Sequence, residues 1–208
     1  MTETDQIATD PAPPSTAAVV AIIGLAIFTC WITWRAKKLE SSLTPSSRPL
    51  ALIHKPAPDF TLPSLDGKAI SLAGYRSQKR VVVSFWASWC GPCRLELPVL
   101  KSFYEKAHKQ DADFEFLAIN LDEDRESAAT ATTKLKLPFP VLLDPQHRVA
   151  DAYGVYGIPA LFVIDKTGHV SFGETGFNIT LEEALAQQLG VDPRLIFPAG
   201  GPNAAARH

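Results

Sequence analysis

The sequence predicts an α/β domain, with helices flanking a mixed β-sheet, preceded by one apolar helix. Stretches rich in β-branched and aromatic residues alternate with helical patterns, as in layered α/β domains. The chain is 46% hydrophobic and 20% charged, which is enough for a packed core and excludes a wholly disordered chain. A long uncharged run near the N-terminus predicts the separate helix. The net charge of −2 gives no reason to expect nucleic acid as a partner.

The apolar run covers residues 17–34 and contains no Asp, Glu, Lys or Arg. As a helix it is about 27 Å long, enough to cross the hydrocarbon core of a bilayer. Trp31 and Trp34 stand at its C-terminal end, where their rings suit the lipid headgroups. A cleaved signal peptide is the alternative, but the tail of residues 1–16 has no Lys or Arg. A buried core helix is the other alternative, but such a helix would normally show a polar stripe, and the run has none. We therefore expect a transmembrane anchor in the lipid bilayer.

Residues 35–55 mix Ser, Pro and charged residues without periodicity and predict a linker. The folded domain is expected over residues 56–190. It opens with a β-hairpin, because Asp66–Gly67 is a strong turn signal between the segments DFTLPSL and KAISL. The segment VVVSFW at residues 81–86 follows, with the composition of a strand that is buried on both faces.

A helix is expected next, because Leu95, Val99 and Phe103 repeat at four-residue spacing. They form an apolar helix face together with the neighbouring Leu100, Tyr104 and Ala107. Residues 191–208 are rich in Pro, Gly and Ala and predict a flexible tail. The other expected elements are strands at 114–121, 141–144, 160–164 and 170–172 and helices at 125–136 and 181–189.

The residues that carry chemistry concentrate in the segment FWASWCGPCRLELP, residues 85–98. Three-residue spacing at a helix start puts Cys90 and Cys93 on one face, close enough for a disulfide. Cys90 comes first, where unpaired backbone N–H groups and the positive end of the helix dipole stabilise a thiolate. Pro92 suits the first turn because it has no N–H to leave unpaired. Cys93 is placed to attack a mixed disulfide formed at Cys90, so the segment predicts reversible dithiol–disulfide exchange.

Other uses of a C-x-x-C pair each need something that the sequence lacks. A structural zinc site needs two more ligands, and there is neither a second Cys pair nor a His pair at ligand spacing. Covalent haem attachment needs His directly after the second Cys, where Arg94 stands. A merely structural disulfide gains little stability from closing so short a loop. Redox exchange is favoured over all three.

The segment WASWCGPC followed by RLELP resembles the signature of the thioredoxin fold. Within that fold, the chain is most similar to the membrane-anchored TlpA/ResA-like thiol–disulfide oxidoreductases. The resemblance covers residues 56–190. It includes the opening segment PAPDFTLPSLDGK, extra helix and strand residues between Asp122 and Gly157, and the segment GIPA at residues 157–160. It implies a thioredoxin fold with an N-terminal β-hairpin and an inserted helix and strand.

The resemblance also implies roles for single residues. Cys90 matches the attacking cysteine and Cys93 the resolving cysteine. Pro159 matches a cis-proline that packs against the disulfide, although an ordinary loop proline is the alternative. The backbone before Pro159 would pair with a substrate strand. The residues implied to contact substrate are Trp89, Gly91, Pro92 and Ile158.

Glu96 matches an acidic position of the TlpA/ResA-like branch, three residues after Cys93. The alternative is a solvated helix glutamate. Minimal thioredoxins bury an aspartate in the strand before the motif, and here Ser84 stands at that position. An acidic proton acceptor would therefore have to be elsewhere, and Glu96 is the nearest candidate.

These observations predict a membrane-tethered enzyme that reduces disulfides in protein substrates. Gly91–Pro92 between the cysteines resembles the reducing thioredoxins. Cytochrome c maturation is the family's best-known task, but nothing in these residues selects it. No flavin or nicotinamide motif is present, so we expect no cofactor beyond the Cys90–Cys93 disulfide. Electrons are then expected from a dithiol protein of the membrane.

Two other functions remain open at this point. A peroxidase of the peroxiredoxin type is supported by the opening hairpin. Against it, those enzymes resemble P-x-x-x-T-x-x-C, and Val83 and Trp86–Ala87 stand where the proline and threonine would be. A non-enzymatic module that binds or delivers a metal such as copper through both thiolates is the second alternative.

The two indications of membrane orientation disagree. The resemblance puts the domain on the extracytoplasmic side, which is the periplasmic side, and we expect it there. Arg35, Lys37 and Lys38 directly follow the apolar run and favour the cytoplasm, although long folded domains translocate largely regardless of charge. Cys30 lies within the apolar run and is expected to be inert, with palmitoylation or a dimer bridge as alternatives.

Overall fold

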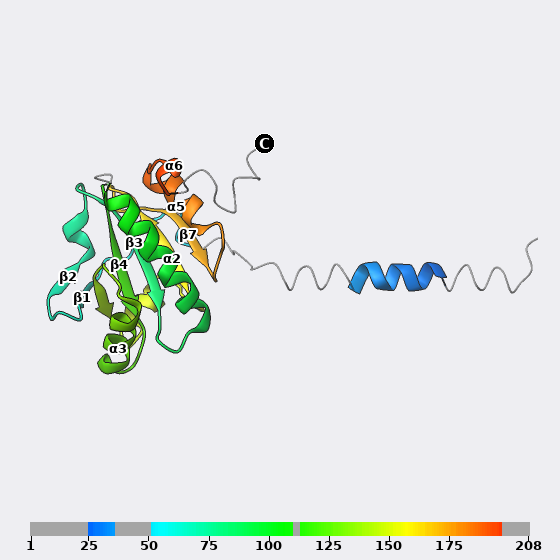
Figure 1. The fold of residues 1–208 in the computed structure, drawn as a ribbon, viewed down its shortest axis with the longest axis horizontal. Helices are drawn as coiled ribbons and strands as arrows, with labels where there is room; N and C mark the ends of the chain where they lie inside the picture. Colours follow the sequence, from blue (N-terminus) through cyan, green and yellow to red (C-terminus); the bar gives the residue numbers. More distant parts are fainter. Residues whose placement is uncertain (1–24, 36–50, 110–112, 197–208) are drawn as a thin grey trace, which may run out of the picture. The chain divides into compact units, whose positions relative to one another are not determined.

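The computed structural model describes residues 25–35, 51–109 and 113–196, shown as coloured ribbon in Figure 1. The chain divides into two compact units, residues 1–44 and 45–208. In the first unit, residues 25–35 form a helix. Among the described residues, no helix is both long and apolar enough to cross a bilayer. The first part of the expected anchor, residues 17–24, lies outside the described residues, as does the expected tail 1–16.

The second unit is built on a five-stranded sheet with the order β5-β4-β3-β6-β7. The central strand, β3, runs parallel to β4 and antiparallel to β6, while β5 is parallel to β4 and β7 is antiparallel to β6. The sheet is therefore mixed, as predicted. The strand bounds are β3 Arg80–Trp86, β4 Phe114–Asn120, β5 Val141–Leu143, β6 Ala160–Ile164 and β7 Val170–Thr175.

The predicted hairpin is present as β1 (Thr61–Pro63) paired antiparallel with β2 (Ala69–Ser71). Gly67 has a φ of +85°, a conformation that residues with a Cβ rarely adopt, so the turn depends on glycine. The Leu65 N–H donates to the Val141 carbonyl at 2.9 Å, which joins the hairpin to the β5 edge of the sheet.

Helices cover the sheet and fill two layers of core. One layer contains buried residues of α2 (Gly91–His108), α5 (Leu181–Leu189) and α6 (Pro193–Ile196). The other contains residues of α4 (Arg148–Ala152) and of the 3-10 helix η1 (Leu72–Tyr75). The remaining helix, α3 (Arg125–Leu135), packs through Ala131 and Leu135 against the first layer. Figure 1 shows α2 lying across the sheet.

The buried face of α2 agrees in part with the predicted one, because Leu100, Phe103 and Ala107 are buried as expected. Leu95 is 62% exposed, and the buried residues of the helix are Cys93, Glu96, Leu97, Leu100, Phe103 and Ala107. The reason is geometric: four residues advance about 40° beyond one helical turn, so a strict four-residue row drifts around the helix. A row that includes three-residue steps stays over the sheet, and it buries Glu96 in place of Leu95.

The folded domain is longer at both ends than residues 56–190. Within the expected linker 35–55, Leu52 and Ile53 pack against the core, and the His54 N–H donates to the Val170 carbonyl at 2.8 Å. Within the expected tail 191–208, residues 193–196 form α6, and Ile196 is only 1% exposed. The composition of both segments is typical of loops, but their few apolar side chains fill gaps at the edge of the core. Residues 36–50 and 197–208 lie outside the described residues.

Candidate active site around the Cys90–Cys93 disulfide

Cys90 is the N-cap residue of α2, at the end of the turn that follows β3. Its Sγ accepts a hydrogen bond from the Cys93 N–H at 3.2 Å, so one of the unpaired amides of the helix start points at this sulfur. The two cysteines form a disulfide with their Cα atoms 5.3 Å apart, as the spacing predicted. Cys90 is 5% exposed and Cys93 is 0% exposed. The sulfur of Cys90 is therefore the one that an outside group can reach.

The segment before β6 lies against the same sulfur. The carbonyl oxygen of Ile158 is 3.7 Å from Cys90 Sγ, and the Ile158–Pro159 peptide bond is cis. The arrangement follows from sheet pairing, because β6 is antiparallel to β3 and pairs Ala160 with Phe85, four residues before the motif's tryptophan. Pro159 is buried, and its carbonyl accepts the Gly176 N–H at 2.8 Å.

Of the residues expected to contact substrate, Ile158 lies near the Cys90 sulfur, and the other three are close to Cys90 in sequence. Gly91 and Pro92 are exposed, and Trp89 is 67% exposed. In the described part of the folded domain, the exposed large hydrophobic side chains are Trp89, Leu95, Tyr156 and Ile179. All four are close in sequence to a segment of the site, since Tyr156 precedes Pro159 by three residues and Ile179 follows Gly176 by three. Among these four side chains, Trp89 directly precedes the attacking cysteine in the chain.

Asp122 supports the turn before Cys90, and sequence reasoning did not single it out as a site residue. It is 4% exposed and accepts the Ser88 N–H with both carboxylate oxygens, at 3.1 and 3.0 Å. It also accepts the Ser88 hydroxyl at 2.9 Å and the Asn120 amide at 2.8 Å. The available signal was an Asn-x-Asp sequence at the carboxyl end of β4, a strand parallel to β3, because the carboxyl ends of parallel strands meet at one edge of the sheet.

Glu96 is buried on α2, three residues after Cys93, and only 2% exposed. The solvated-glutamate alternative is therefore excluded. Burial raises the pKa of Glu96 to about 8, and the charge of Glu174 contributes in the same direction. A carboxyl whose pKa is raised toward the neutral range is suited to take up and release a proton near neutral pH.

Glu174 is a second buried acid that sequence reasoning missed. It lies on β7, is 7% exposed, and accepts a hydrogen bond from the Asn178 amide at 2.6 Å. No local motif marks it, because β7 is far from α2 in sequence. Ser84, at the position of the thioredoxin aspartate, is 1% exposed, and its hydroxyl has no hydrogen-bond partner among the described residues.

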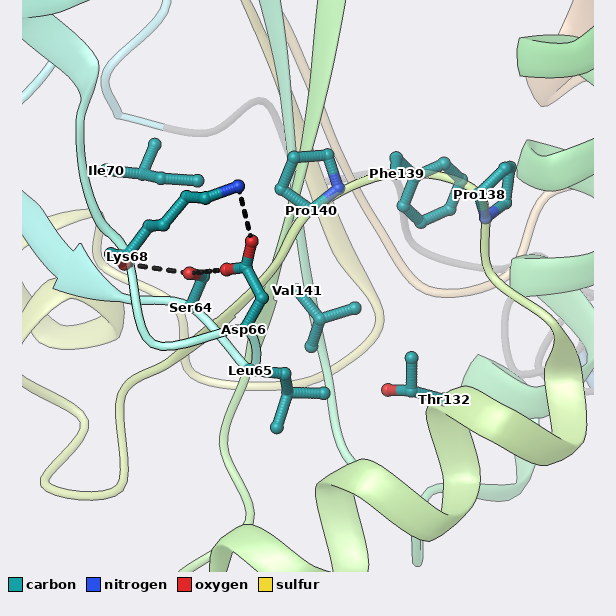
Figure 2. A pocket seen from close by; sticks show the side chains of 10 residues that line it. All are labelled: Ser64, Leu65, Asp66, Lys68, Ile70, Thr132, Pro138, Phe139, Pro140 and Val141. Atoms are coloured by element: carbon teal, nitrogen blue, oxygen red, sulfur yellow. Dashed lines mark hydrogen bonds and ion pairs between the residues drawn. The ribbon is translucent and has the colours of Figure 1, made fainter.

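A groove of about 380 Å³ lies elsewhere, between the β1–β2 hairpin and residues 138–141. Figure 2 shows Asp66, one of the residues that line this groove, contacting both Ser64 and Lys68. The hydrogen bonds from Ser64 and Lys68 lower the pKa of Asp66 to about 2. None of the predicted site residues lines this groove. Within the part of the chain that the structure describes, no group of three or more His, Cys, Asp or Glu is placed to hold a metal ion.

The fold and the site define a thiol–disulfide oxidoreductase of the thioredoxin fold. The chain belongs to the AhpC/TSA family, whose model matches residues 53–172. It is 39% identical over 120 residues to the thiol-disulfide oxidoreductase ResA of Geobacillus thermodenitrificans, covering 58% of this chain and 67% of that one. With the ResA of Geobacillus kaustophilus it shares 34% identity over 158 residues, covering 76% of this chain and 82% of that one.

Solved structures agree with this assignment. A Chlorobium tepidum protein described as a thiol:disulfide interchange protein DsbE matches with a TM-score of 0.59 and 32% identity, covering 73% of this chain and 99% of that one. StoA of Bacillus subtilis matches with a TM-score of 0.54 and 27% identity, covering 63% of this chain and 96% of that one. The predicted TlpA/ResA-like resemblance, thioredoxin fold and enzyme class are confirmed.

Proposed function

We propose that this enzyme reduces disulfides in extracytoplasmic protein substrates, and that residues 17–34 tether it to the membrane. The observation that carries the chemical part is the placement of Cys90. Its sulfur caps α2, accepts a helix N–H, and is the less buried sulfur of the pair. A thiolate there is stabilised by the helix N-terminus, which lowers the pKa of a thiol and favours it as the attacking group.

The proposed reaction has two exchange steps. In the first, the Cys90 thiolate attacks one sulfur of the substrate disulfide, a mixed disulfide forms, and the other substrate sulfur leaves as a thiolate. In the second, the Cys93 thiolate attacks Cys90, the Cys90–Cys93 disulfide forms, and the remaining substrate sulfur leaves. Two electrons pass to the substrate, and each departing thiolate takes up a proton. Glu96 is proposed to accept the proton that Cys93 must lose before the second step.

The surface around the disulfide supports a protein as the substrate. Ile158 offers a backbone carbonyl beside the attacking sulfur, where an extended substrate segment can add as a strand. Trp89, Gly91, Pro92 and Pro159 border this position, and the exposed rings of Trp89 and Tyr156 can cover apolar side chains on either side of the substrate cysteine. Aromatic side chains of this kind contribute strongly to protein interfaces.

The reducing direction and the electron source are also part of the proposal. Gly91–Pro92 between the cysteines favours a reductant. Electrons are proposed to come from a dithiol protein of the membrane, with the Cys90–Cys93 disulfide as the only redox group needed. Curated relatives are named ResA, and a structural neighbour is described as DsbE. These names are compatible with a role in cytochrome c maturation, which is the partner pathway to test first.

Trapping of the substrate tests the assignment of the two cysteines. Cys93→Ser should leave Cys90 joined to its substrate, because a serine hydroxyl cannot displace a sulfur. The complex should survive non-reducing electrophoresis, disappear on reduction, and identify the substrate by mass spectrometry. Cys90→Ser should trap nothing, since Cys93 is fully buried. Trapping by Cys90→Ser alone would reverse the two roles.

The tether and the orientation need their own experiment. If the domain is extracytoplasmic, a reporter that works only outside the cytoplasm should be active when it is fused after His208. A reporter that works only in the cytoplasm should be silent at the same position. Membrane fractionation should retain the full chain and release a variant without residues 17–34. Activity of a cytoplasmic reporter at the same position would instead support the orientation favoured by Arg35, Lys37 and Lys38.

A thiol peroxidase is the second candidate, because the family that matches this chain also takes its name from AhpC and TSA proteins and because the opening hairpin is present. Val83 and Ala87 stand in place of the proline and threonine of the peroxidatic motif, which weighs against it. Peroxide consumption in the presence of a thiol donor tests this candidate. Turnover of hydrogen peroxide at a rate comparable to that of disulfide reduction would favour it.

A further inference from the structure

The turn at residues 144–147 connects the elements that carry the two halves of the active site. One half is the turn after β3 that carries Cys90. The other is the loop before β6, whose Ile158 carbonyl oxygen is 3.7 Å from Cys90 Sγ. Residues 144–147 follow β5 and precede α4, and α4 leads along the chain to that loop. Hydrogen bonds join the same turn to the end of β4, and through β4 to the Cys90 turn.

The first connection to the Cys90 turn runs through the backbone of Asp144. Its N–H donates to the Asn120 carbonyl at 2.9 Å. The Asn120 side chain exchanges two hydrogen bonds with Asp122: its Nδ2 donates to the carboxylate at 2.8 Å, and its Oδ1 accepts the Asp122 N–H at 3.0 Å. Asp122 in turn holds the N–H of Ser88, two residues before Cys90. Asn120 and Asp122 are buried, so water does not compete for these bonds.

The second connection runs through the ring of His147. Its Nε2 lies 3.0 Å from the Leu121 carbonyl oxygen. A carbonyl oxygen only accepts, so Nε2 carries the proton that makes this bond. The N–H of Leu121 donates to the Trp86 carbonyl at 2.9 Å, and Trp86 is the last residue of β3. His147 is therefore two hydrogen bonds away from the strand that ends at the Cys90 turn.

The same turn also holds the start of α4. Asp144 is 2% exposed, and its carboxylate accepts three backbone N–H groups at 3.0 Å, those of Arg148, Val149 and Ala150. The chain after α4 bonds back onto the helix, where the Val155 N–H donates to the Ala150 carbonyl at 2.9 Å. The turn, α4 and Val155 thus form one bonded segment.

The loop that contains Ile158 is held differently on its two sides. On the side of β6, the Pro159 carbonyl accepts the Gly176 N–H at 2.8 Å, so the sheet fixes its position. On the other side, residues 156–157 are exposed and connect Ile158 to Val155. The position of the Ile158 backbone therefore depends on where α4 is held.

The backbone of His147 shows what its ring adds. Its φ is +56° and its ψ is 22°, a left-handed conformation that residues with a Cβ rarely adopt. Gly and Asn suit this conformation best, so the turn alone does not call for a histidine. Neither a glycine nor an asparagine at this position places a donor as far from the backbone as His147 Nε2. The feature that distinguishes His147 is its bond to Leu121.

We propose that His147 is a positioning residue for the exchange with protein substrates. Its hydrogen bond to Leu121 holds α4, and with it the Ile158 backbone, at a fixed separation from the Cys90 turn. The inference rests on the proposed function, in which an extended substrate segment pairs with the Ile158 backbone while its disulfide meets Cys90. Both contacts form together only when the two halves of the site are correctly spaced.

Two kinds of disulfide separate this role from a general effect on the fold. A small disulfide, 5,5′-dithiobis(2-nitrobenzoic acid), needs only the Cys90 sulfur. Reduced enzyme releases a first coloured thiolate from it when Cys90 attacks and a second when Cys93 resolves the mixed disulfide. A pair of short extended peptides joined by one disulfide also uses the Ile158 backbone. Loss of the His147 bond should therefore slow the reaction with the peptides and leave the first thiolate release unchanged.

His147→Asn and His147→Gln distinguish the hydrogen bond from the backbone conformation. The Gln amide nitrogen stands the same number of bonds from Cβ as His Nε2, so it can donate to Leu121. The Asn amide is one bond shorter, but Asn is the better residue at positive φ. If the ring positions the loop, Asn should slow peptide reduction by about 3- to 10-fold, the effect of one hydrogen bond, and Gln should stay near the wild-type rate. If only the backbone conformation matters, Asn should be at least as active as Gln.

His54→Asn is the matched control. His54 is also an exposed histidine with a positive φ, of +64°, and its N–H bonds to β7 rather than to the site. The same substitution there should change neither reaction. Rates are measured on the full-length reduced protein in detergent micelles. Because His147 is exposed, its variants are expected to fold, and urea unfolding checks this.

The other outcomes each have a definite meaning. An unchanged peptide rate in His147→Asn would overturn the role of His147 and leave the proposed function standing. Equal losses in Asn and Gln, or equal losses with both disulfides, would also overturn it, because neither pattern follows from one donor that positions one loop. A wild-type enzyme that reduces the small disulfide but not the peptides would overturn the proposed function, and the role of His147 with it.

Nitrogen-15 NMR of the histidine rings tests the bond without any substrate. In the neutral ring of His147 the proton should be on Nε2, because only that tautomer can donate to Leu121. A neutral ring with its proton mainly on Nδ1 would overturn the proposal.

Discussion

Both carboxylate oxygens of Asp122 accept a hydrogen bond from the backbone N–H of Ser88, at 3.1 and 3.0 Å. This contact ties the turn that carries Trp89 and Cys90 to the end of β4, so the position of the attacking sulfur depends on a neighbouring strand. The Ser88 hydroxyl adds a third bond to the same carboxylate at 2.9 Å. The turn that carries Cys90 is thus held in place by a residue that lies outside the C-x-x-C segment.

Asp122→Asn tests this support. The amide can accept from Ser88 with one oxygen only, so we expect a stability loss of about 1–3 kcal/mol. A displaced nucleophile should also slow Cys90 attack, by up to about 100-fold for a shift near 1 Å. Urea unfolding and the first thiolate release measure the two effects. Glu123→Gln, at the exposed neighbouring position, should change neither.

The pH dependence of stability should report Glu96. Its pKa is raised from an ordinary 4.5 to about 8 in the folded protein, mainly by burial. Between these values the folded state binds more protons than the unfolded state, so the free energy of unfolding should fall as pH rises. The expected slope from this residue is about 1.4 kcal/mol per pH unit in the middle of that window.

Urea unfolding at a series of pH values between 5 and 8 measures this slope. Glu96→Gln should flatten it, because the amide does not titrate. Glu105→Gln on the exposed side of the same helix should leave the slope in place. A slope that is identical in wild type and Glu96→Gln would show that Glu96 titrates normally.

Tyr156→Ala and Trp89→Ala should weaken protein substrates selectively. Both rings are exposed, with Trp89 directly before Cys90 and Tyr156 three residues before Pro159, and removing an aromatic contact from an interface costs about 1–2 kcal/mol, or roughly 5- to 30-fold in KM. A small aromatic disulfide reaches Cys90 without using this surface, so its rate should stay near the wild-type value. Equal losses with both substrates would mean that the rings support the fold rather than the substrate.

Ile196→Ala tests the extended domain. Ile196 is 1% exposed in the core layer of α2 and α5, and removing a buried isoleucine side chain costs about 2–5 kcal/mol. Ile179→Ala deletes the same atoms from a side chain that is 82% exposed, and it should leave stability within about 0.5 kcal/mol. Equal urea midpoints for the two variants would show that Ile196 contributes no more to stability than the exposed Ile179, and that α6 is not part of the core.

Sequence reasoning succeeded where the determinants are local. The turn at Asp66–Gly67, the apolar strand at residues 81–86 and the C-x-x-C helix start each depend on neighbours a few residues apart, and each is present. The placement of Cys90 at a helix N-cap follows from the same few residues. A short segment can therefore define both a piece of the fold and the reactive sulfur.

It failed where residues meet across the sheet. Glu174 is buried on β7, which pairs with β6, and no pattern within β7 indicates what lies on its buried face. The burial of Glu96 in place of Leu95 depends on which face of α2 packs against the sheet. Ile196 lies within a segment that has the composition of a loose tail, yet it packs in the core with α2 and α5. Each of these depends on packing between distant segments.

Four residues of the site lie at the same end of the sheet. Cys90 follows β3, Pro159 precedes β6, Asp122 follows β4 and Gly176 follows β7. The other end carries the turn at residues 165–168, where Asp165 caps a tight loop and Lys166 pairs with Asp113. Exposed Thr167 in that turn is therefore a natural attachment point for a fluorophore or an immobilisation handle. A label attached at Thr167 lies at the opposite end of the sheet from the disulfide. It can therefore report substrate binding in a single-molecule assay without contacting the bound protein.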